Sequence, residues 1–508
     1  MIFHHTGSMD TYITNKIVNN ESRATGGNVG YASTIDLFKL YGETTLKGVA
    51  GLCTLGDGTV RDDMSEQECS DAGGTWNENL TELSRGLLYF DLAQLKSEIE
   101  SRVNVQTDTS LQVILKLKDV QGTQVAPSNF TLELCPLISP FTEGLGDNIT
   151  TFGDSFTANW LSRTDSEDWS EPGGVLTVDY TAPIATQIFS SGLEDLEMDI
   201  TDWARRVWND ETINNGWMLK FTDELESDTR TYFVKRFSSR HSRNPMLRPM
   251  ISVSWNNFLI DDHLDFYTGS TNKLTIRNFV QGTASNTINP PKVTLSYGTW
   301  SKESTASLVS LGSIEQTGHY EASINVDLYG EDSALATDIT SSGSILVQER
   351  WTYEDDSTPA NTILIHSGSI TMNYPLASAS GVSKEWRFSL LDLKSSYVAN
   401  ESPQIRLFVR ERNLENEPVR IPIQLPSQII RKAYYQVKDT NNMKVIIPFS
   451  DKLSTPNEST RISTDASGMY FSFPASLLPR GRTYTIDVAY YDRGERMVWE
   501  SNMAFKVK

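Results

Sequence analysis

The residues best suited to chemistry gather in one short basic stretch, KRFSSRHSRNPMLRP, at positions 235–249. It holds one of only six histidines, His241, and five cations: Lys235, Arg236, Arg240, Arg243 and Arg248. Cations beside an imidazole are typical of a proton-transfer site, of a nucleic-acid groove, or of ion pairs inside a folded domain. The remainder of the chain decides among these three.

The overall charge argues against a polyanionic partner. The 508 residues include 65 acidic and 44 basic side chains, for a net charge of −21. A protein that binds phosphates gains by releasing counterions through Lys and Arg, and a mostly acidic surface repels such ligands. We therefore expect no nucleic-acid partner. Arg236, Arg240 and Arg248 are instead predicted to form a structural clasp of intradomain ion pairs, with the acidic turn TDELESDTR (222–230) as their partner.

Sequence marks of catalysis are missing. There is no G-x-S-x-G, no H-E-x-x-H and no phosphate-binding loop, and the histidines are scattered. We predict that the chain is not an enzyme and has no catalytic residues. A polysaccharide-degrading enzyme is the weakest alternative, because it needs two opposed carboxylates across a cleft.

Two other kinds of binding site have candidate residues in the sequence. The acidic loops at 56–63 and 353–361 resemble calcium loops only loosely, so we expect no cofactor and keep calcium as a weak alternative. Trp160 and Trp169 are candidates for stacking on carbohydrate, against the alternative that they fill a core.

The cysteines are Cys53, Cys69 and Cys135, an odd number that is no disulfide framework. Cys53 and Cys69 lie in a polar, glycine-rich excursion and are candidates for one disulfide, with two thiols as the alternative. No C-x-x-C pair is present, so zinc is not expected. No apolar run approaches the roughly 20 residues of a membrane span, so no membrane partner is expected.

Strand signals dominate the chain, in short alternating runs bounded by turn residues. Helical spacing is confined to 91–100 and 199–210, with Thr201 or Asp202 as the expected N-cap of the second helix. We predict an all-β fold of three consecutive β-sandwiches of the jelly-roll or Ig-like kind, with one or two short helices in the first. The expected domains are 1–256, 257–376 and 377–508.

Several ordered motifs in residues 20–256 resemble the DNRLRE-type β-sandwich domains, which are related to a carbohydrate-binding module family. They are NVGYASTIDLFKLYG (28–42), SRGLLYFDLAQL (84–95), FTEGLGDNITTF (141–152), ANWLSRTDSEDWSEPGG (158–174), MDITDWARRVWNDETINNGWMLKF (198–221) and the ending KRFSSRHSRNPMLRPMISVSW (235–255). The chain departs from the family pattern at His241, where the family usually has Glu, which puts an ion pair there in doubt. Residues 53–76 are an insertion that resembles small inserts in structural proteins of tailed bacteriophages.

The C-terminal motifs, including DASGMYFSFPASLLPRGRTYTIDVAYYDRG (465–494), resemble the C-terminal sandwich of marine myophage virion proteins. These resemblances imply a non-enzymatic structural protein of a tailed-phage virion, in the neck or collar, the tail or the capsid exterior. Its expected partners are other virion proteins and further copies of itself. The start of the chain lacks a signal peptide, so synthesis is expected in the host cytoplasm and residence in the virion. The alternative function is a carbohydrate-binding adhesion protein that recognises host-surface or extracellular polysaccharide.

Overall fold

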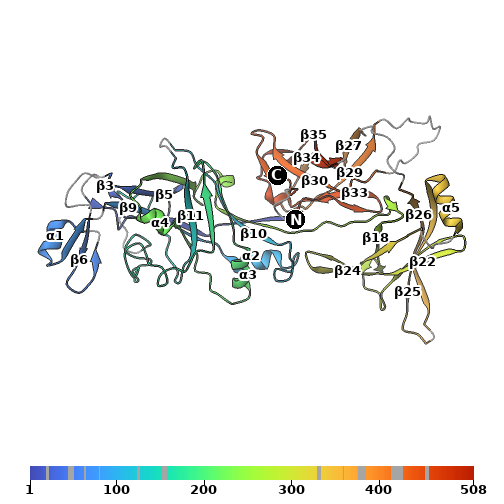
Figure 1. The fold of residues 1–508 in the computed structure, drawn as a ribbon, viewed down its shortest axis with the longest axis horizontal. Coiled ribbons are helices and arrows are strands. Elements are labelled where there is room, and N and C mark those ends of the chain that lie inside the picture. The colour runs from blue at the N-terminus through green and yellow to red at the C-terminus, as the bar shows by residue number, and fades with distance from the viewer. Residues whose placement is uncertain are drawn as a thin grey trace. The chain divides into compact units, whose positions relative to one another are not determined.

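The computed structural model describes residues 1–18, 22–43, 51–61, 64–78, 80–122, 126–151, 157–328, 333–358, 360–375, 385–412, 427–451, 457–492 and 494–508. The chain forms two compact units. The N-terminal unit comprises Phe3–Glu100 and Gln112–Val253, and the C-terminal unit comprises Met1–Ile2, Ser101–Leu111 and Ser254–Lys508. The structure is all-β, as predicted (Figure 1).

The N-terminal unit contains two main sheets and two small ones. The first has the strand order β1-β16-β10-β13, and the second has the order β12-β11-β14-β9-β5-β15, with β2 also paired to β9. Their strands are β1 (Ile2–Thr6), β2 (Met9–Thr14), β5 (Thr34–Tyr41), β9 (Thr81–Tyr89), β10 (Gln112–Leu117), β11 (Phe130–Pro136), β12 (Ala185–Phe189), β13 (Leu196–Asp199), β14 (Trp217–Phe221), β15 (Tyr232–Ser238) and β16 (Met250–Ser254). The small sheets pair β3 (Ile17–Val18) with β4 (Ser22–Arg23), and β6 (Gly51–Thr54) with both β7 (Val60–Arg61) and β8 (Thr75–Glu78).

The helices of this unit are α1 (Glu66–Asp71), α2 (Leu92–Ile99), α3 (Thr201–Trp208), α4 (Asp223–Ser227) and the 3-10 turn η1 (Pro245–Leu247). Helix α2 matches the prediction: Asp91 caps its N-terminus and Leu92, Leu95 and Ile99 are buried. The predicted cap of α3 is wrong, because Ile200 occupies the N-cap position without a side-chain hydrogen bond. The Thr201 hydroxyl bonds β10 and β13 instead: it accepts from Val113 N and donates to Asp199.

The first half of the C-terminal unit is a sandwich of two sheets, β17-β26-β25-β21-β22 and β18-β24-β23, beside the hairpin β19-β20. Side chains of both sheets share one core that includes Leu274, Val293, Tyr320 and Val347. The elements are β17 (Phe266–Tyr267), β18 (Thr271–Arg277), β19 (Phe279–Val280), β20 (Thr283–Ala284), β21 (Lys292–Tyr297), β22 (Trp300–Thr305), β23 (Ser307–Leu311), β24 (Ile314–Asn325), α5 (Ser333–Ser342), β25 (Ser344–Glu354) and β26 (Thr362–Asn373).

The second half packs the sheets β27-β29-β33-β32 and β28-β35-β34-β30-β31 around a core rich in aromatic residues. The elements are β27 (Trp386–Leu391), β28 (Ser396–Tyr397), β29 (Gln404–Glu411), β30 (Ala433–Asp439), β31 (Val445–Ile447), β32 (Ser463–Asp465), β33 (Gly468–Ser472), η2 (Ala475–Leu477), β34 (Thr483–Asp492) and β35 (Glu495–Val507). The expected hairpin at 493–494 is present, because Asp492 pairs with Glu495 and Gly494 has φ +86°. Arg493 lies outside the described residues.

The structure differs from the sequence expectations in its helices and in the placement of residues 101–111. Helices α1, α4 and α5 lie in segments that we expected to be strand, turn or loop. Residues 101–111 were expected in the first domain, but they pack in the C-terminal unit, where Asn104 N donates to Gly312 O at 2.8 Å and Ser313 donates to Asp108 at 3.0 Å. The predicted boundary at 376/377 falls outside the described residues. Among the described residues, no helix is long and apolar enough to cross a membrane.

Candidate functional site

The basic stretch runs from strand β15 through a turn to β16, and these two strands belong to different sheets of the N-terminal unit. Arg236 lies directly opposite Asp36 of β5, and its Nε and Nη2 donate to the two carboxylate oxygens at 2.7 and 2.5 Å. Such a two-pronged cross-strand pair fixes register as well as adding energy. Arg236 therefore joins the strand pair β15–β5 rather than facing a ligand.

Lys235 is almost fully buried, and its ammonium donates to Asp119 at 2.5 Å and to the carbonyls of Gly192 and Glu194, each at 2.8 Å. Its amine also lies 4.9 Å from the ring centroid of Phe237. A buried ammonium is tolerated only when its donors are satisfied, and here three oxygens satisfy them. The Lys235 ammonium therefore stabilises the fold and does not face a ligand.

Arg240 forms the second two-pronged pair of the clasp, with Glu143. Its backbone N–H donates to Asp10 Oδ2 at 2.6 Å, and Asp10 N donates to Glu143 Oε1 at 2.8 Å. The turn after β15, the strand β2 and the loop at 143 are thereby joined. Asp10 Oδ1 is buried without a hydrogen-bond partner, and burial raises the pKa of this carboxyl to about 7.

His241, the position that departs from the family pattern, contributes little to this network. Its Nε2 lies 3.9 Å from Glu143 Oε1, and its ring centroid lies 4.5 Å from that of Tyr31. Burial and the neighbouring Arg240 charge lower its pKa, so it is a neutral ring packed on an aromatic one near pH 7. The carboxylate that pairs with Arg240 is Glu143.

The loop that carries Glu143 is held by Asn28. Its Nδ2 donates to the carbonyls of Glu143 and Ala158 at 2.9 and 3.0 Å, and its Oδ1 accepts from Gly30 N and Gly146 N. A Cβ on Gly30 would lie 2.2 Å from the Glu143 carbonyl oxygen, so only glycine fits this close approach. The asparagine–glycine loop thus positions the acceptor of Arg240.

The third residue of the clasp, Arg248, has a weaker contact. Its Nε donates to Ser242 O at 3.1 Å, which closes the turn on itself. The predicted partner turn, 222–230, is wrong for all three arginines. Its carboxylates serve other cations, since Asp228 binds Lys39 at 2.6 Å and Glu226 binds Arg85 at 2.5 Å.

Trp160 and Trp169 do not offer an exposed stacking surface: they are 3% and 5% exposed. The Trp169 indole donates to Asn159 O at 2.9 Å, and the Trp160 ring lies 5.6 Å from the guanidinium carbon of Arg85. Both belong to a core between one face of the larger sheet and the long loop that follows β11. The carbohydrate-stacking prediction for these two residues is therefore wrong, and their alternative role as core residues holds.

Arg85 organises this core. It is buried, with Nη1 donating to the carbonyls of Gly173 and Gly174 at 2.7 and 2.9 Å and Nη2 donating to Glu226. A cavity of about 430 Å³ opens nearby and is lined by Asn129, Phe130, Thr131, Glu133, Thr222, Asp223, Glu224 and Leu225. Two of its carboxylates, Glu133 and Asp223, accept from Lys220 Nζ at 2.8 and 2.6 Å. Both carboxylates are therefore held in ion pairs with Lys220.

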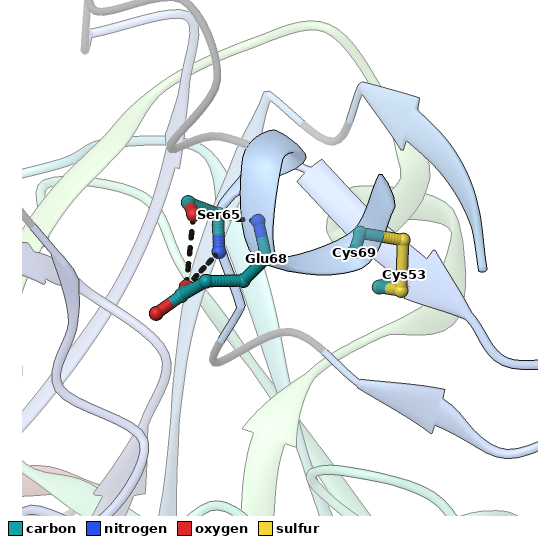
Figure 2. Close-up of a disulfide and its surroundings, with 4 residues drawn as sticks. All are labelled: Cys53, Ser65, Glu68 and Cys69. Carbon is teal, nitrogen blue, oxygen red and sulfur yellow. Dashed lines mark hydrogen bonds between the residues drawn. A yellow bond between two sulfur atoms is a disulfide. The ribbon is translucent and has the colours of Figure 1, made fainter. Parts of the chain in front are cut away.

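The cysteine insertion is a small stapled module between two paired strands. Tyr41 of β5 pairs with Thr81 of β9, so the segment between them leaves the sheet and returns to it. Cys53 and Cys69 form a disulfide, as Figure 2 shows. Both side chains are fully buried. A Cβ on Gly74 would lie 2.6 Å from Cys53 Sγ, so the bridge needs glycine at its side.

Helix α1 of this module begins with a capping box that we missed. Ser65 Oγ accepts from Glu68 N, and the Glu68 carboxylate accepts from Ser65 N at 2.7 Å (Figure 2). The pattern S-E-Q-E at 65–68 was the available signal. Cys69 lies on the same helix, so the cap and the disulfide together fix a helix of only six residues.

A buried triad in the C-terminal unit was also missed. His263 binds Asp261 through Nδ1 and Glu349 through Nε2, the latter at 2.9 Å. Burial lowers its pKa, but the two carboxylates outweigh burial and raise it to about 10. A ring that donates from both nitrogens has no lone pair for general-base chemistry, so the triad is a structural ion cluster.

The two candidate calcium loops show no metal site within their described residues. In the second, the Asp355 carboxylate accepts from the Ser357 hydroxyl, from Asn361 N at 2.8 Å and from Ser357 N at 3.1 Å, and these bonds lower its pKa to about 2. Positions 62, 63 and 359 of these loops lie outside the described residues. Across the described part of the chain, no three acidic, histidine or cysteine side chains converge as metal ligands.

No family model matches the chain, and no curated protein matches it. Among solved structures, a titin fragment aligns with 50% of this chain and 96% of its own, at 9% identity and a TM-score of 0.15. The FN1–FN3 domains of chicken CNTN1 align with 78% of this chain and 99% of their own, at 9% identity and the same TM-score. Trypsin-activated alpha-2-macroglobulin from Escherichia coli covers 99% of this chain with 30% of its own length, at 7% identity and a TM-score of 0.15. Scores this low carry no argument about function.

Proposed function

We propose that this chain is a non-enzymatic structural component of a tailed-phage virion that docks on other virion proteins through its rigid β-sandwiches. One observation carries the proposal furthest. In the basic stretch, where a ligand site was most plausible, Lys235, Arg236 and Arg240 are bonded to carboxylates of other segments of the same unit. These ion pairs stabilise the fold of the unit. The side chains that form them are engaged within the fold and do not present their charges to a substrate.

The disulfide module supports the same role. A staple of buried cysteines on an insertion stabilises a projection that must survive outside a cell, where thiols oxidise. The phage assignment itself rests on the motif resemblances, and neck or collar is preferred to tail and capsid exterior. The carbohydrate-binding alternative has lost its specific support, because Trp160 and Trp169 are buried.

Immunogold electron microscopy of particles from the source culture tests the proposal. Antibodies against the purified chain are expected to label one fixed location on tailed particles. Labelling of cell surfaces or of soluble polysaccharide, with bare particles, would favour the adhesion function and contradict the proposal.

A further inference from the structure

Strand β26 is the second strand of the β25–β26 hairpin (gold in Figure 1), and within the described part of the chain most of its outer edge is unpaired. Strand β25 pairs with β26 along its whole length on one side. On the other side β17 pairs in parallel with Met372 and Asn373 alone. Among the described residues, no other strand pairs with 362–371 on that side. An open edge presents a row of unpaired N–H and C=O groups that can template pairing with another chain.

This edge lacks the charged side chains and prolines that commonly block such pairing. Residues 362–371, TILIHSGSIT, contain no Asp, Glu, Lys, Arg or Pro, and His366 is their only titratable side chain. The opposite edge of the same sheet, β22, carries Lys302 and Glu303. The corresponding long strand β35, which is likewise capped by a short parallel strand, carries Arg496 and Glu500. Because this edge carries no charged side chains that would repel or disrupt an added strand, it is suited to pairing with another strand.

A bulge in β26 determines which of its residues lie opposite each other when two copies pair antiparallel. The register of β25 and β26 shifts between Trp351 and Thr352, so Leu364 lies opposite Thr352 and Ser369 lies opposite Gln348. Because Gln348 and Thr352 are four residues apart, Leu364 and Ser369 share one face of the sheet although five positions separate them. Without the bulge they would point to opposite faces.

Ile363 and Ile370 of β26 also share one face of the sheet. Ile363 lies opposite Tyr353 and Ile370 lies opposite Val347, six residues apart on β25 and hence on one face. Two antiparallel copies of β26 can therefore place Ile363 against Ile370, and Leu364 against Ser369, with matching faces at both ends. In this arrangement Ile365 is again the extra residue of each copy, and Ser367 lies opposite its own mate. Strand β17 limits the overlap to 362–371, which is the length that this register uses.

We propose that the edge 362–371 of β26 pairs antiparallel with the same edge of a second copy of this chain, joining two five-stranded sheets across a twofold axis. Isologous contacts of this kind are the commonest in homo-oligomers. The proposal deepens the structural role proposed above, since it names one interface of the building block. It is tested on the purified full chain, so its failure is distinguishable from failure of the virion assignment.

The test is self-association of the full chain, measured by light scattering after gel filtration at up to about 300 µM, where an association with Kd on the order of 10 µM is mostly formed. The wild type is expected at twice the 56.9 kDa of one chain. The variant Leu364→Lys/Ser369→Lys places lysine opposite lysine twice and should weaken association about tenfold or more. The variant Leu364→Glu/Ser369→Lys places glutamate opposite lysine twice and should restore it. Both side chains are exposed, so folding should be unaffected.

A matched control is Val498→Lys/Met503→Lys on β35, where two exposed side chains change without touching the proposed interface. Its mass should equal that of the wild type. A wild type that is monomeric at the highest concentration would overturn the proposal. It would do so even if a different protein pairs with this edge in the assembled particle. So would a dimer that survives the double lysine variant, or one that the glutamate–lysine variant fails to restore.

Discussion

Arg236 lies directly opposite Asp36 in the antiparallel pair of β15 and β5, and its guanidinium donates to both oxygens of that carboxylate. The two residues are 200 positions apart in the sequence. This contact couples the last strand of the larger sheet to one of its first, so its loss should act on the stability of the whole unit.

Arg236→Ala is expected to lower the free energy of unfolding by about 1–2 kcal/mol, because the half-buried Asp36 loses both donors. Denaturant unfolding measures the change. Arg243→Ala, at an exposed position of the same stretch, should change stability by less than about 0.5 kcal/mol. Equal effects of the two substitutions would contradict a specific role for the Arg236–Asp36 pair.

Asp10 should make stability depend on pH. Its pKa is raised from 3.8 to about 7 in the folded protein, mainly by burial, with the Glu143 charge adding and Arg240 opposing. The stabilising contribution of a group with a raised pKa is fully present below pH 4 and is lost as pH rises through 7. Asp10→Asn retains an acceptor for Arg240 N but cannot ionise. Relative to the wild type, it should become more stable by a few kcal/mol between pH 4 and 8.

The check is a series of denaturant titrations at several pH values on the wild type and on Asp10→Asn. His241 also faces this cluster, so His241→Gln serves as the control and should leave the pH-dependent difference in place. A difference between wild type and Asp10→Asn that stays constant across this range would show that Asp10 does not titrate as proposed.

The Cys53–Cys69 disulfide can be tested by counting the thiols that react with an alkylating reagent. Native protein treated with an alkylating reagent should take up no label, because all three cysteines are buried and two are bonded. Unfolding without reductant should expose Cys135 alone, and unfolding with reductant should expose all three. Mass spectrometry reads one label against three. Three labels without reductant would rule out the bridge.

Removing Arg85 should be costly. Arg85→Ala leaves the buried Glu226 without its main partner, and breaking a buried ion pair costs about 3–5 kcal/mol. The double variant Arg85→Ala/Glu226→Ala should lose less stability than Arg85→Ala alone, since no uncompensated charge remains. Additive losses in a double-mutant cycle would contradict a direct pair.

Local signals allowed the all-β class, the helix at 91–100 and the β34–β35 hairpin to be predicted, because each depends on neighbouring residues. The partner of Arg236 could not be predicted, because it depends on which strands meet across 200 positions. Charge proximity in sequence favoured 222–230, yet those carboxylates bind Lys39, Lys220 and Arg85 of other strands.

The burial of Trp160 and Trp169 could not be predicted from the sequence either. A tryptophan in a loop has no periodic pattern that separates burial from exposure, and Trp160 is buried by a loop that folds back on the sheet. By contrast, the helix that carries Cys69 had a local signature in Ser65 and Glu68 that was available and overlooked.

The most direct test of the structural role is quantitative mass spectrometry across a density gradient of particles from the source culture. The proposal predicts that this chain sediments with capsid proteins at a fixed ratio, and that the ratio gives its copy number. Absence from the particle band, with the chain left in the medium, would contradict it.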